Sequence, residues 1–291
     1  MSKQEIYDQL LNSYKSILFN YSLSIEYCDE RIKYDFDCPE YKKLIQKYQI
    51  DKIAGKGDDF VRAKRLTKYF APKLFHSSYY DNHVPYNALD LLDYSFNDKE
   101  HGINCLNKAK ILQESCLALG IKCRIVGIMP YSPFDLDTHV VNEIYDNRLH
   151  KWIMLDITTN GYFIDEDKTP LSLLEMRDKF AYDQFITFVN VSSKLNNINK
   201  LKDLNIETNV YFAKNLFYFA IGTEQKFGPY SDAYLIGPRN YDYNKNKIMN
   251  CDYRIENIPE KYIEIINSTK QIKEEIRHSK EPKIISSVIM L

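Results

Sequence analysis

Three residues of this chain, Cys105, His139 and Asp156, have the types and the spacing that a thiol-based reaction needs. Cys105 lies at the start of a predicted helix, His139 opens a predicted strand, and Asp156 lies near the end of the next strand. A cysteine thiolate is a nucleophile, a histidine beside it can move its proton, and a carboxylate can hold the histidine in position. The three together predict a nucleophile, a base and an orienting acid.

The register of the predicted hairpin decides whether His139 and Asp156 can meet. A turn centred between Asn147 and Arg148 places His139 directly opposite Asp156. A turn centred one residue later shifts the pairing, so that position 141 lies opposite Asp156. Because side chains alternate between the two faces of a strand, both registers keep His139 and Asp156 on one face. We therefore expect Asp156 to hold His139, and His139 to face Cys105 across the contact between helix and sheet.

Residues 104–119 form the predicted helix that positions the cysteine. Its apolar stripe advances by alternating steps of four and three residues and consists of Cys105, Ala109, Leu112, Cys116 and Leu119. Gly120 ends the helix, as a C-terminal glycine often does. We expect this stripe to pack on the sheet, with the thiol in the first turn. There the partial positive charge of the helix N-terminus favours a thiolate.

Each of these residues by itself has a simpler structural explanation. A cysteine on an apolar stripe is usually a small buried hydrophobic residue. A histidine at a strand start is usually on the surface, and an aspartate at a strand end usually forms a turn. That explanation suffices for Cys116 and Cys123, neither of which begins a helix. For Cys105, His139 and Asp156, the matching orientation of all three favours a functional site.

Four sequence motifs extend this pattern. They are GINC at 102–105, LALGIKCRIVG at 117–127, THVVNEIY at 138–145 and WIMLDIT at 152–158. Together they resemble the core of the transglutaminase-like superfamily, including bacterial proteins with a transglutaminase domain. That family combines the cysteine nucleophile after a glycine, a helix that ends in leucine-glycine, a histidine motif and a Trp-x-x-Leu-Asp motif. Each motif is weak alone, but the combination is specific.

The resemblance implies an α+β fold with a papain-like, transglutaminase-like core. In such a core the nucleophilic cysteine begins a helix packed on an antiparallel sheet, and here extra helices would flank it. The resemblance implies Cys105 as nucleophile, His139 as general base and acid, and Asp156 as the residue that orients the histidine. The implied reaction is cleavage, deamidation or transfer at an amide through an acyl-enzyme. The implied substrate is a protein or peptide with an amide or glutamine side chain, with no cofactor and no metal.

The chain departs from the family pattern at three places. Gly102 lies three residues before Cys105, where many relatives have the glycine two residues before. Val140 and Val141 stand where the family has Ala-Trp, and Ile157 replaces the proline of the Leu-Asp-Pro-Thr motif. None of these changes removes a catalytic group, so they bear on the subclass of substrate more than on the chemistry.

An oxyanion formed during acyl transfer needs hydrogen-bond donors. The backbone N–H of Cys105 is available because it lies at a helix start. A side-chain donor should come from upstream, and Asn87 is the candidate, with Tyr86 and Asn104 behind it. A helix-capping or surface role explains Asn87 at least as well.

Composition excludes several classes of protein. The chain has 291 residues, 44% of them hydrophobic and 27% charged, which are ordinary values for a globular protein. The net charge of −1 argues against a general nucleic-acid binder. No apolar run is long enough to cross a membrane, and no signal peptide is recognisable, so a cytoplasmic location is expected. The six cysteines contain no CxxC pair, which argues against a structural zinc site.

The pattern of elements predicts three regions: a helical region at 1–84, the transglutaminase-like core at 85–191, and an α/β extension at 192–291 packed on the core. The predicted helices cover 4–18, a segment after Cys38-Pro39, 60–75, 86–94, 104–119, 170–182 and 259–278. The predicted strands cover 122–129, 139–145, 152–158 and the final IISSVIML. Residues 192–205 read as a linker, and the aromatic stretch 211–222 fits a core, an interface or a lid.

Three other functions compete with a thiol hydrolase or acyltransferase. The first is a non-catalytic peptide- or protein-binding module on the same fold, which would usually have lost one residue of the triad. The second is an arylamine acetyltransferase-like enzyme, which would need a site for a CoA nucleotide that no basic or glycine-rich segment provides. The third is a zinc protein that uses Cys105, Cys116, Cys123 and His139. The oligomeric state is not predicted.

Overall fold

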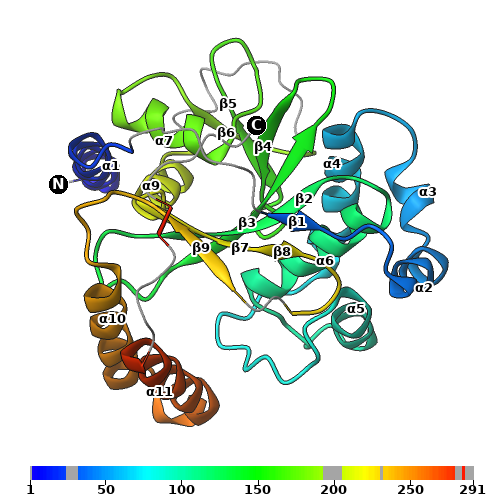
Figure 1. Ribbon diagram of the computed structural model, residues 1–291. Helices are drawn as coiled ribbons and strands as arrows, with labels where there is room; N and C mark the ends of the chain where they lie inside the picture. Colours follow the sequence, from blue (N-terminus) through cyan, green and yellow to red (C-terminus); the bar gives the residue numbers. More distant parts are fainter. Residues whose placement is uncertain (1, 24–31, 193–204, 230–231, 279–283, 286–291) are drawn as a thin grey trace.

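A computed structural model describes residues 2–23, 32–192, 205–229, 232–278 and 284–285 (Figure 1). Its helices are α1 (Lys3–Asn20), α2 (Pro39–Tyr48), α3 (Ile50–Ala54), α4 (Asp59–Phe70), α5 (Ala88–Asn97), α6 (Cys105–Ala118), α7 (Leu173–Ala181), α9 (Ile206–Asn215), α10 (Tyr243–Asn257) and α11 (Ile263–His278), with the 3-10 helices η1 (Ala71–Lys73) and η2 (Glu260–Tyr262). Its strands are β1 (Lys33–Tyr34), β2 (Cys123–Met129), β3 (His139–Asp146), β4 (Lys151–Leu155), β5 (Gly161–Ile164), β6 (Thr187–Asn190), β7 (Tyr218–Gly222), β8 (Glu224–Gln225), β9 (Ala233–Ile236) and β10 (Ile284–Ile285).

A six-stranded sheet in the order β10-β9-β7-β2-β3-β4 forms the centre of the molecule. All neighbours in it are antiparallel except β10 and β9. Helices α2 to α6 lie on one side of this sheet, α1, α7 and α9 lie on the other, and α10 and α11 pack on each other beside it (Figure 1). The mixture of helices with a mainly antiparallel sheet agrees with the α+β class that the sequence predicts.

Helix α6 is the buried helix that carries Cys105. The side chain of Asn104 caps it by accepting a hydrogen bond from the backbone N–H of Asn107, and Gly120 follows it with a left-handed φ of 73°. The amide of Asn142 on β3 donates to the carbonyl of Ala109 at 2.9 Å, so the predicted stripe does face the sheet. The prediction of a single packed face is nevertheless incomplete. Helices α2, α4 and α5 cover the remaining faces of α6.

The hairpin between β3 and β4 adopts the second of the two predicted registers. Asn142 pairs with Leu155 and Asp146 pairs with Lys151, so the turn is centred between residues 148 and 149, one residue later than in the first register. The Asp146 carboxylate accepts hydrogen bonds from the backbone N–H of residues 148 and 149 at 3.1 and 2.9 Å, and His150 has a φ of 51°. These side chain–backbone bonds favour a four-residue turn, so the first register is wrong.

The aromatic stretch 211–222 belongs to the core. Its second half is β7, a central strand between β9 and β2, and its first half lies in α9, where Phe212 is fully buried. The region predicted as a C-terminal extension thus contributes strands to the same sheet as β3. The boundaries at 84/85 and 191/192 stay predictions. Most of the predicted linker 192–205 and the residues after 285 lie outside the described residues.

A buried ion pair ties β2 to β3 and supplies the first testable prediction. The Arg124 guanidinium donates to the Glu143 carboxylate at 3.0 and 2.6 Å, and the backbone N–H of Leu173 donates to the second oxygen at 2.9 Å. Glu143→Gln leaves a buried guanidinium without its counter-charge. We expect the free energy of unfolding, measured in urea, to fall by about 3–5 kcal/mol.

A matched control is the exposed ion pair between Lys47 and Asp93, whose side chains are 53% and 47% exposed. Lys47→Gln should change the free energy of unfolding by about 1 kcal/mol or less. Equal effects of Glu143→Gln and Lys47→Gln would contradict the assignment of the Arg124–Glu143 pair to the buried core.

Candidate active site

Cys105 is the first residue of α6, as the sequence predicts. Its side chain is partly buried, and Asn104 before it has an extended backbone conformation that starts the helix. The first N–H groups of a helix have no partner within it, so the N-terminus carries a partial positive charge. The thiol therefore lies where a negative charge on sulfur is stabilised.

His139 and Asp156 lie at the same end of two neighbouring strands. His139 is the first residue of β3, and Asp156 directly follows the last residue of β4. The Nε2 atom of His139 is 2.8 Å from Oδ2 of Asp156, and the two residues are 3% and 0% exposed. The structure thus places these two side chains within hydrogen-bonding distance, as the sequence predicts. They are offset diagonally rather than directly opposite, because of the hairpin register.

The side on which this pair lies differs from the expectation. Asn142 contacts α6, whereas Val141, like the odd-numbered His139, belongs to the opposite side of the sheet, which packs against α9. The His139 ring accordingly lies 5.4 Å from the ring of Tyr211 and 6.0 Å from that of Phe212. Cys105 therefore reaches His139 around the end of the strands, and not through the middle of the helix–sheet contact.

The Asp156 carboxylate is held by three donors. Besides His139, the Thr159 hydroxyl donates to Oδ2 at 2.6 Å and the backbone N–H of Thr158 donates to Oδ1 at 2.7 Å. The backbone of Asp156 also exchanges two hydrogen bonds with Gly161, which closes the turn. Burial by itself would raise the pKa of Asp156, but the charge of His139 and these donors lower it below its ordinary value. The residue is an anion at neutral pH.

The ring of His139 is correspondingly easy to protonate. Burial opposes its charge, but the charge of Asp156, their hydrogen bond and the Cys105 thiol outweigh burial and raise the pKa of His139 to about 10. A hydrogen bond between the Cys105 side chain and His139 is among these causes. Since Nε2 is occupied by Asp156, Nδ1 is the ring nitrogen left for Cys105. The arrangement can hold a thiolate–imidazolium pair with a carboxylate behind it.

Tyr211 and two acidic residues line the side of the site toward α9. The Tyr211 hydroxyl donates to Asp137 at 3.4 Å, and burial together with the negative groups at Asp137 and Cys105 raises its pKa. The Lys214 ammonium lies 2.9 Å from a carboxylate oxygen of Asp135 and 3.4 Å from one of Asp137. These contacts attach the loop before β3 to α9 and thereby fix the position of His139.

The three side chains proposed around the oxyanion have other partners. Asn87 caps α5, accepting from the backbone N–H of Asp90 at 3.0 Å and donating to its carboxylate at 2.6 Å. Asn104 caps α6 and donates to Asn82 at 3.1 Å. The ring of Tyr86 lies under the ammonium of Lys110, 5.2 Å from its centroid. The capping explanation of Asn87 therefore fits better, and its role at the oxyanion stays an untested prediction without a supporting contact.

Two residues beside the His139–Asp156 pair, Lys108 and His76, were not predicted from the sequence. Lys108 follows Cys105 by one helical turn and is 3% exposed. His76 precedes the core and interacts electrostatically with Lys108, His139 and Asp156; burial is the main cause that lowers its pKa. The spacing of three residues on one helix could have pointed to Lys108, since such residues share a face. No local signal distinguishes His76.

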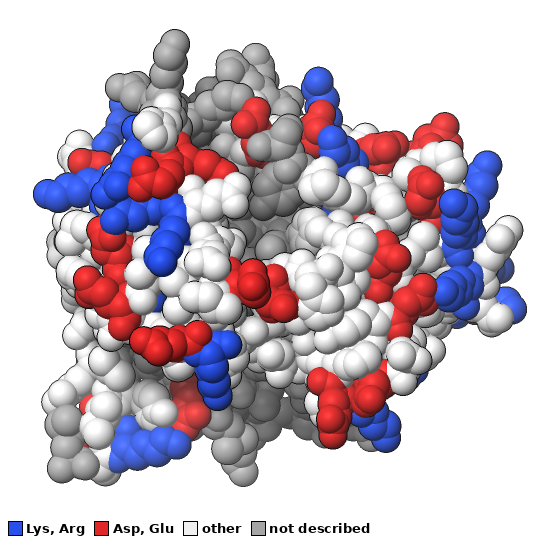
Figure 2. Space-filling view, turned by 90° about the horizontal axis from the view of Figure 1, so that it is seen from below, with Lys and Arg blue, Asp and Glu red and all other residues white. Residues whose placement is uncertain are grey.

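A pocket of about 340 Å³ lies between the segment before α6, which leads to Cys105, and the η2–α11 segment. Its lining includes Tyr79, Tyr80, Asp81, Gly102 and Tyr262, and the rings of Tyr79 and Tyr262 stack at 4.1 Å. On the face seen from below, carboxylate and basic side chains of the described residues are intermixed (Figure 2). This face presents no single sign of charge to a partner.

The described residues also bear on metal binding and on membrane insertion. No group of three or more His, Cys, Asp or Glu side chains among them is arranged to hold a metal ion, so the zinc alternative gains no support. None of the described helices is long and apolar enough to span a membrane.

A cysteine at a helix start and a buried histidine–carboxylate pair form a candidate thiol-histidine-carboxylate site on a mixed α+β core with a mainly antiparallel sheet. Residues 46–157 match the family model of the transglutaminase-like superfamily, and this segment contains all three residues of the site. The resemblance that the sequence motifs predict is therefore confirmed for this part of the chain. The comparison with curated proteins gave no match.

Proposed function

We propose that this protein is a thiol-dependent amide hydrolase or acyltransferase that forms an acyl-enzyme on Cys105. The observation that carries the proposal is the buried hydrogen bond of 2.8 Å between His139 and Asp156 next to a thiol at a helix N-terminus. The match of residues 46–157 to the transglutaminase-like superfamily supports the same class of chemistry, because that superfamily includes cysteine hydrolases and acyltransferases.

Acylation uses the thiolate and the imidazolium together. The Sγ atom of Cys105 attacks the carbonyl carbon of an amide, a C–S bond forms, and the electron pair of the C=O bond moves to the oxygen. When that pair returns, the C–N bond breaks and the proton of His139 passes to the leaving nitrogen. Asp156 stays an anion throughout and keeps the imidazole in the orientation that serves both steps.

Deacylation reverses these roles. A water molecule or an amine attacks the thioester, His139 takes its proton, and Sγ leaves with the electron pair of the C–S bond. Water gives hydrolysis or deamidation, and an amine gives transfer. The substrate class that fits is a protein or peptide with a backbone amide or a glutamine side chain. No step in this sequence uses a cofactor.

A non-catalytic binding module on the same fold is the alternative, because some transglutaminase-like proteins have lost activity. Loss of function usually removes a residue of the triad, and here all three are present. The hydrogen bonds from Thr158 and Thr159 that hold Asp156 also favour an enzyme over a module that only retains the fold.

Alkylation with iodoacetamide, mapped by mass spectrometry, tests the Cys105–His139 pair without knowledge of the substrate. At about pH 6 we expect Cys105 to be labelled at least about tenfold faster than Cys38, because only thiolates react and His139 holds the proton. Cys38 is a matched internal control, since it is also partly buried and burial with the nearby Glu40 raises its pKa to about 11. His139→Ala should slow the labelling of Cys105 and leave that of Cys38 unchanged.

Equal labelling of the two cysteines, or a rate at Cys105 that His139→Ala does not change, would contradict the proposed pair and favour the binding module. A thermal unfolding curve of His139→Ala, compared with the parent protein, excludes a trivial loss of structure.

A further inference from the structure

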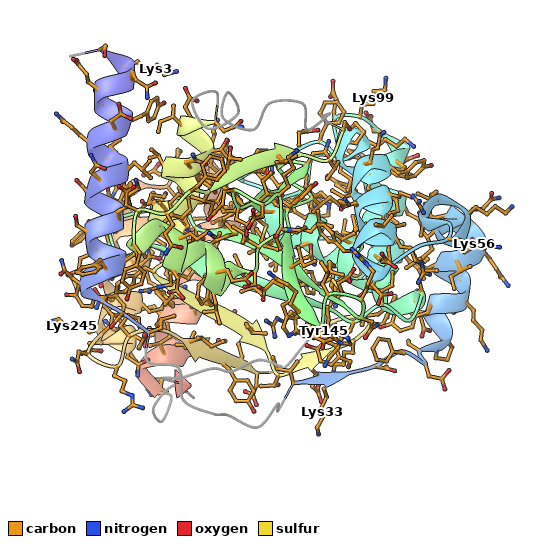
Figure 3. The ribbon with its side chains drawn as sticks, turned by 90° about the horizontal axis from the view of Figure 1, so that it is seen from above. Lys3, Lys33, Lys56, Lys99, Tyr145 and Lys245 are labelled. Carbon is orange, nitrogen blue, oxygen red and sulfur yellow. The ribbon has the colours of Figure 1, made fainter. Side chains whose placement is uncertain are left out.

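Lys108 is a buried lysine in the candidate active site. It lies in α6 one turn after Cys105, and its residue exposure is only 3%. By contrast, Lys3, Lys33, Lys56 and Lys99 are exposed and project from the periphery of the molecule (Figure 3). Residues three apart on a helix share a face, and side chains on a helix lean toward its N-terminus. Lys108 is therefore directed back toward Cys105.

The ammonium group of Lys108 has no hydrogen bond and no ion pair with any described residue. Its main electrostatic neighbours are Asp156 and Cys105, and His76 faces it from the segment before the core. The carboxylate of Asp156 already receives donors from His139, Thr158 and Thr159. Burial, opposed in part by Asp156 and Cys105, lowers the pKa of Lys108 to about 8. The group is thus mostly a cation at neutral pH.

The next lysine of the same helix shows what a structural buried lysine is like in this protein. Lys110 is 1% exposed, and its ammonium donates to Gln113 at 3.0 Å and to the carbonyl of Lys226 at 2.7 Å, with Glu114 at 3.0 Å. Every donor of Lys110 thus has a protein partner. The Lys108 ammonium has no such partner among the described residues, although its residue exposure is only 3% and its electrostatic neighbours are Asp156 and Cys105.

Backbone donors lie beside this ammonium. The N–H of Asn107 is used by the Asn104 side chain, and the N–H of Lys108 is used by the Asn104 carbonyl at 3.1 Å. The N–H groups of Cys105 and Leu106 have no acceptor among the described residues. Two free N–H groups at the start of a 14-residue helix, next to an unpartnered ammonium, form a site for one negatively charged oxygen.

We propose that Lys108 and the backbone N–H of Cys105 bind the oxyanion of the tetrahedral intermediate. Lys108 thus takes the role of side-chain donor for which the sequence suggested Asn87. The proposal rests on the proposed function. When Sγ of Cys105 attacks, the C–S bond forms and the electron pair of the C=O bond moves to the oxygen. The negative charge thus leaves sulfur and arrives on an oxygen beside the same ammonium. Lys108 keeps its proton, and the pair returns when the C–N bond breaks.

The test compares an anionic with a neutral reagent of similar size. Iodoacetate and iodoacetamide alkylate the same thiol, and the ratio of their rates at Cys105 reports the positive charge next to it. Near pH 7, Lys108→Met should lower this ratio by about fivefold, Lys108→Arg should preserve it, and the exposed control Lys99→Met should not change it. In the parent protein the ratio should fall as the pH rises from about 7 to 9, while His139 is still protonated.

Turnover gives the second readout. With any amide substrate that the parent protein cleaves, Lys108→Met should lower kcat by about 100-fold with little change in KM, and Lys108→Arg should restore part of the rate. An unchanged reagent ratio in Lys108→Met would overturn the proposal, whatever happens to kcat. If the ratio falls as expected but no amide is turned over by the parent protein, the anion site stands as a binding site and the proposed function fails instead.

Discussion

Replacement of Cys105 by alanine is expected to lower amide turnover by about 10⁶-fold, the largest effect of any substitution in this protein. The reason is that both half-reactions pass through the C–S bond to Sγ, which forms in acylation and breaks in deacylation. Cys116 and Cys123 are buried further along the core, and burial, together with the hydrogen bond that the Cys123 thiol makes to Cys116, raises the pKa of Cys123 well above its ordinary value. The measurement is kcat with a glutamine-containing peptide, followed by ammonia release or by incorporation of an amine.

Cys38→Ala is the matched control and should keep the parent rate. A covalent readout accompanies the kinetics: acid quenching during turnover should trap a mass increase equal to the acyl group on the peptide that contains Cys105. Turnover in Cys105→Ala above about one per cent of the parent rate would exclude the thioester route and with it the proposed function.

Asp156→Asn is expected to lower kcat by about 10⁴-fold, by analogy with the known effect of the same change in a serine protease triad. The substitution keeps size and shape but removes the negative charge that outweighs the burial of His139. Without it, burial lowers the pKa of His139, and the amide can stabilise the wrong tautomer. The alkaline limb of the pH–rate profile, near pH 10 in the parent protein, should move down by about 1–3 pH units.

The stability of the protein should follow the same charges. His139 has a raised pKa, so its protonated form stabilises the fold fully below about pH 6.5, and this contribution is lost as the pH rises through about 10. In Asp156→Asn that dependence should disappear from urea unfolding curves measured across the alkaline range. A variant with the parent pH profile and the parent rate would show that Asp156 does not act on His139.

The helix that starts at Cys105 could be derived from sequence alone. The spacing of its apolar residues, the capping Asn104 and the terminating Gly120 are all local signals, and each depends only on neighbours within a few positions. The same holds for the strands β2, β3 and β4 and for the alternation that keeps His139 and Asp156 on one face. These features are set by backbone geometry, which a short segment already determines.

The register of the hairpin could be narrowed to two possibilities but not decided. The deciding contacts are those of the Asp146 carboxylate, which binds the turn at residues 148 and 149 and also the backbone N–H of Phe60, far away in the chain, at 3.1 Å. A contact over such a sequence distance leaves no mark on the local pattern. The side of the sheet on which His139 lies was predicted wrongly for the same reason, because α9, which packs on that side, comes much later in the chain.

The sequence by itself therefore determined the class of fold, the position of Cys105 at a helix start and the pairing of His139 with Asp156. Only the tertiary structure decided that Asn87 caps a helix and that Lys108 is buried next to the thiol. The physical reason is that helix and strand formation depend on local periodicity, whereas the burial of a polar side chain depends on which distant elements cover it. A lysine on a helix reads as a surface residue until the neighbouring helices and the sheet enclose it.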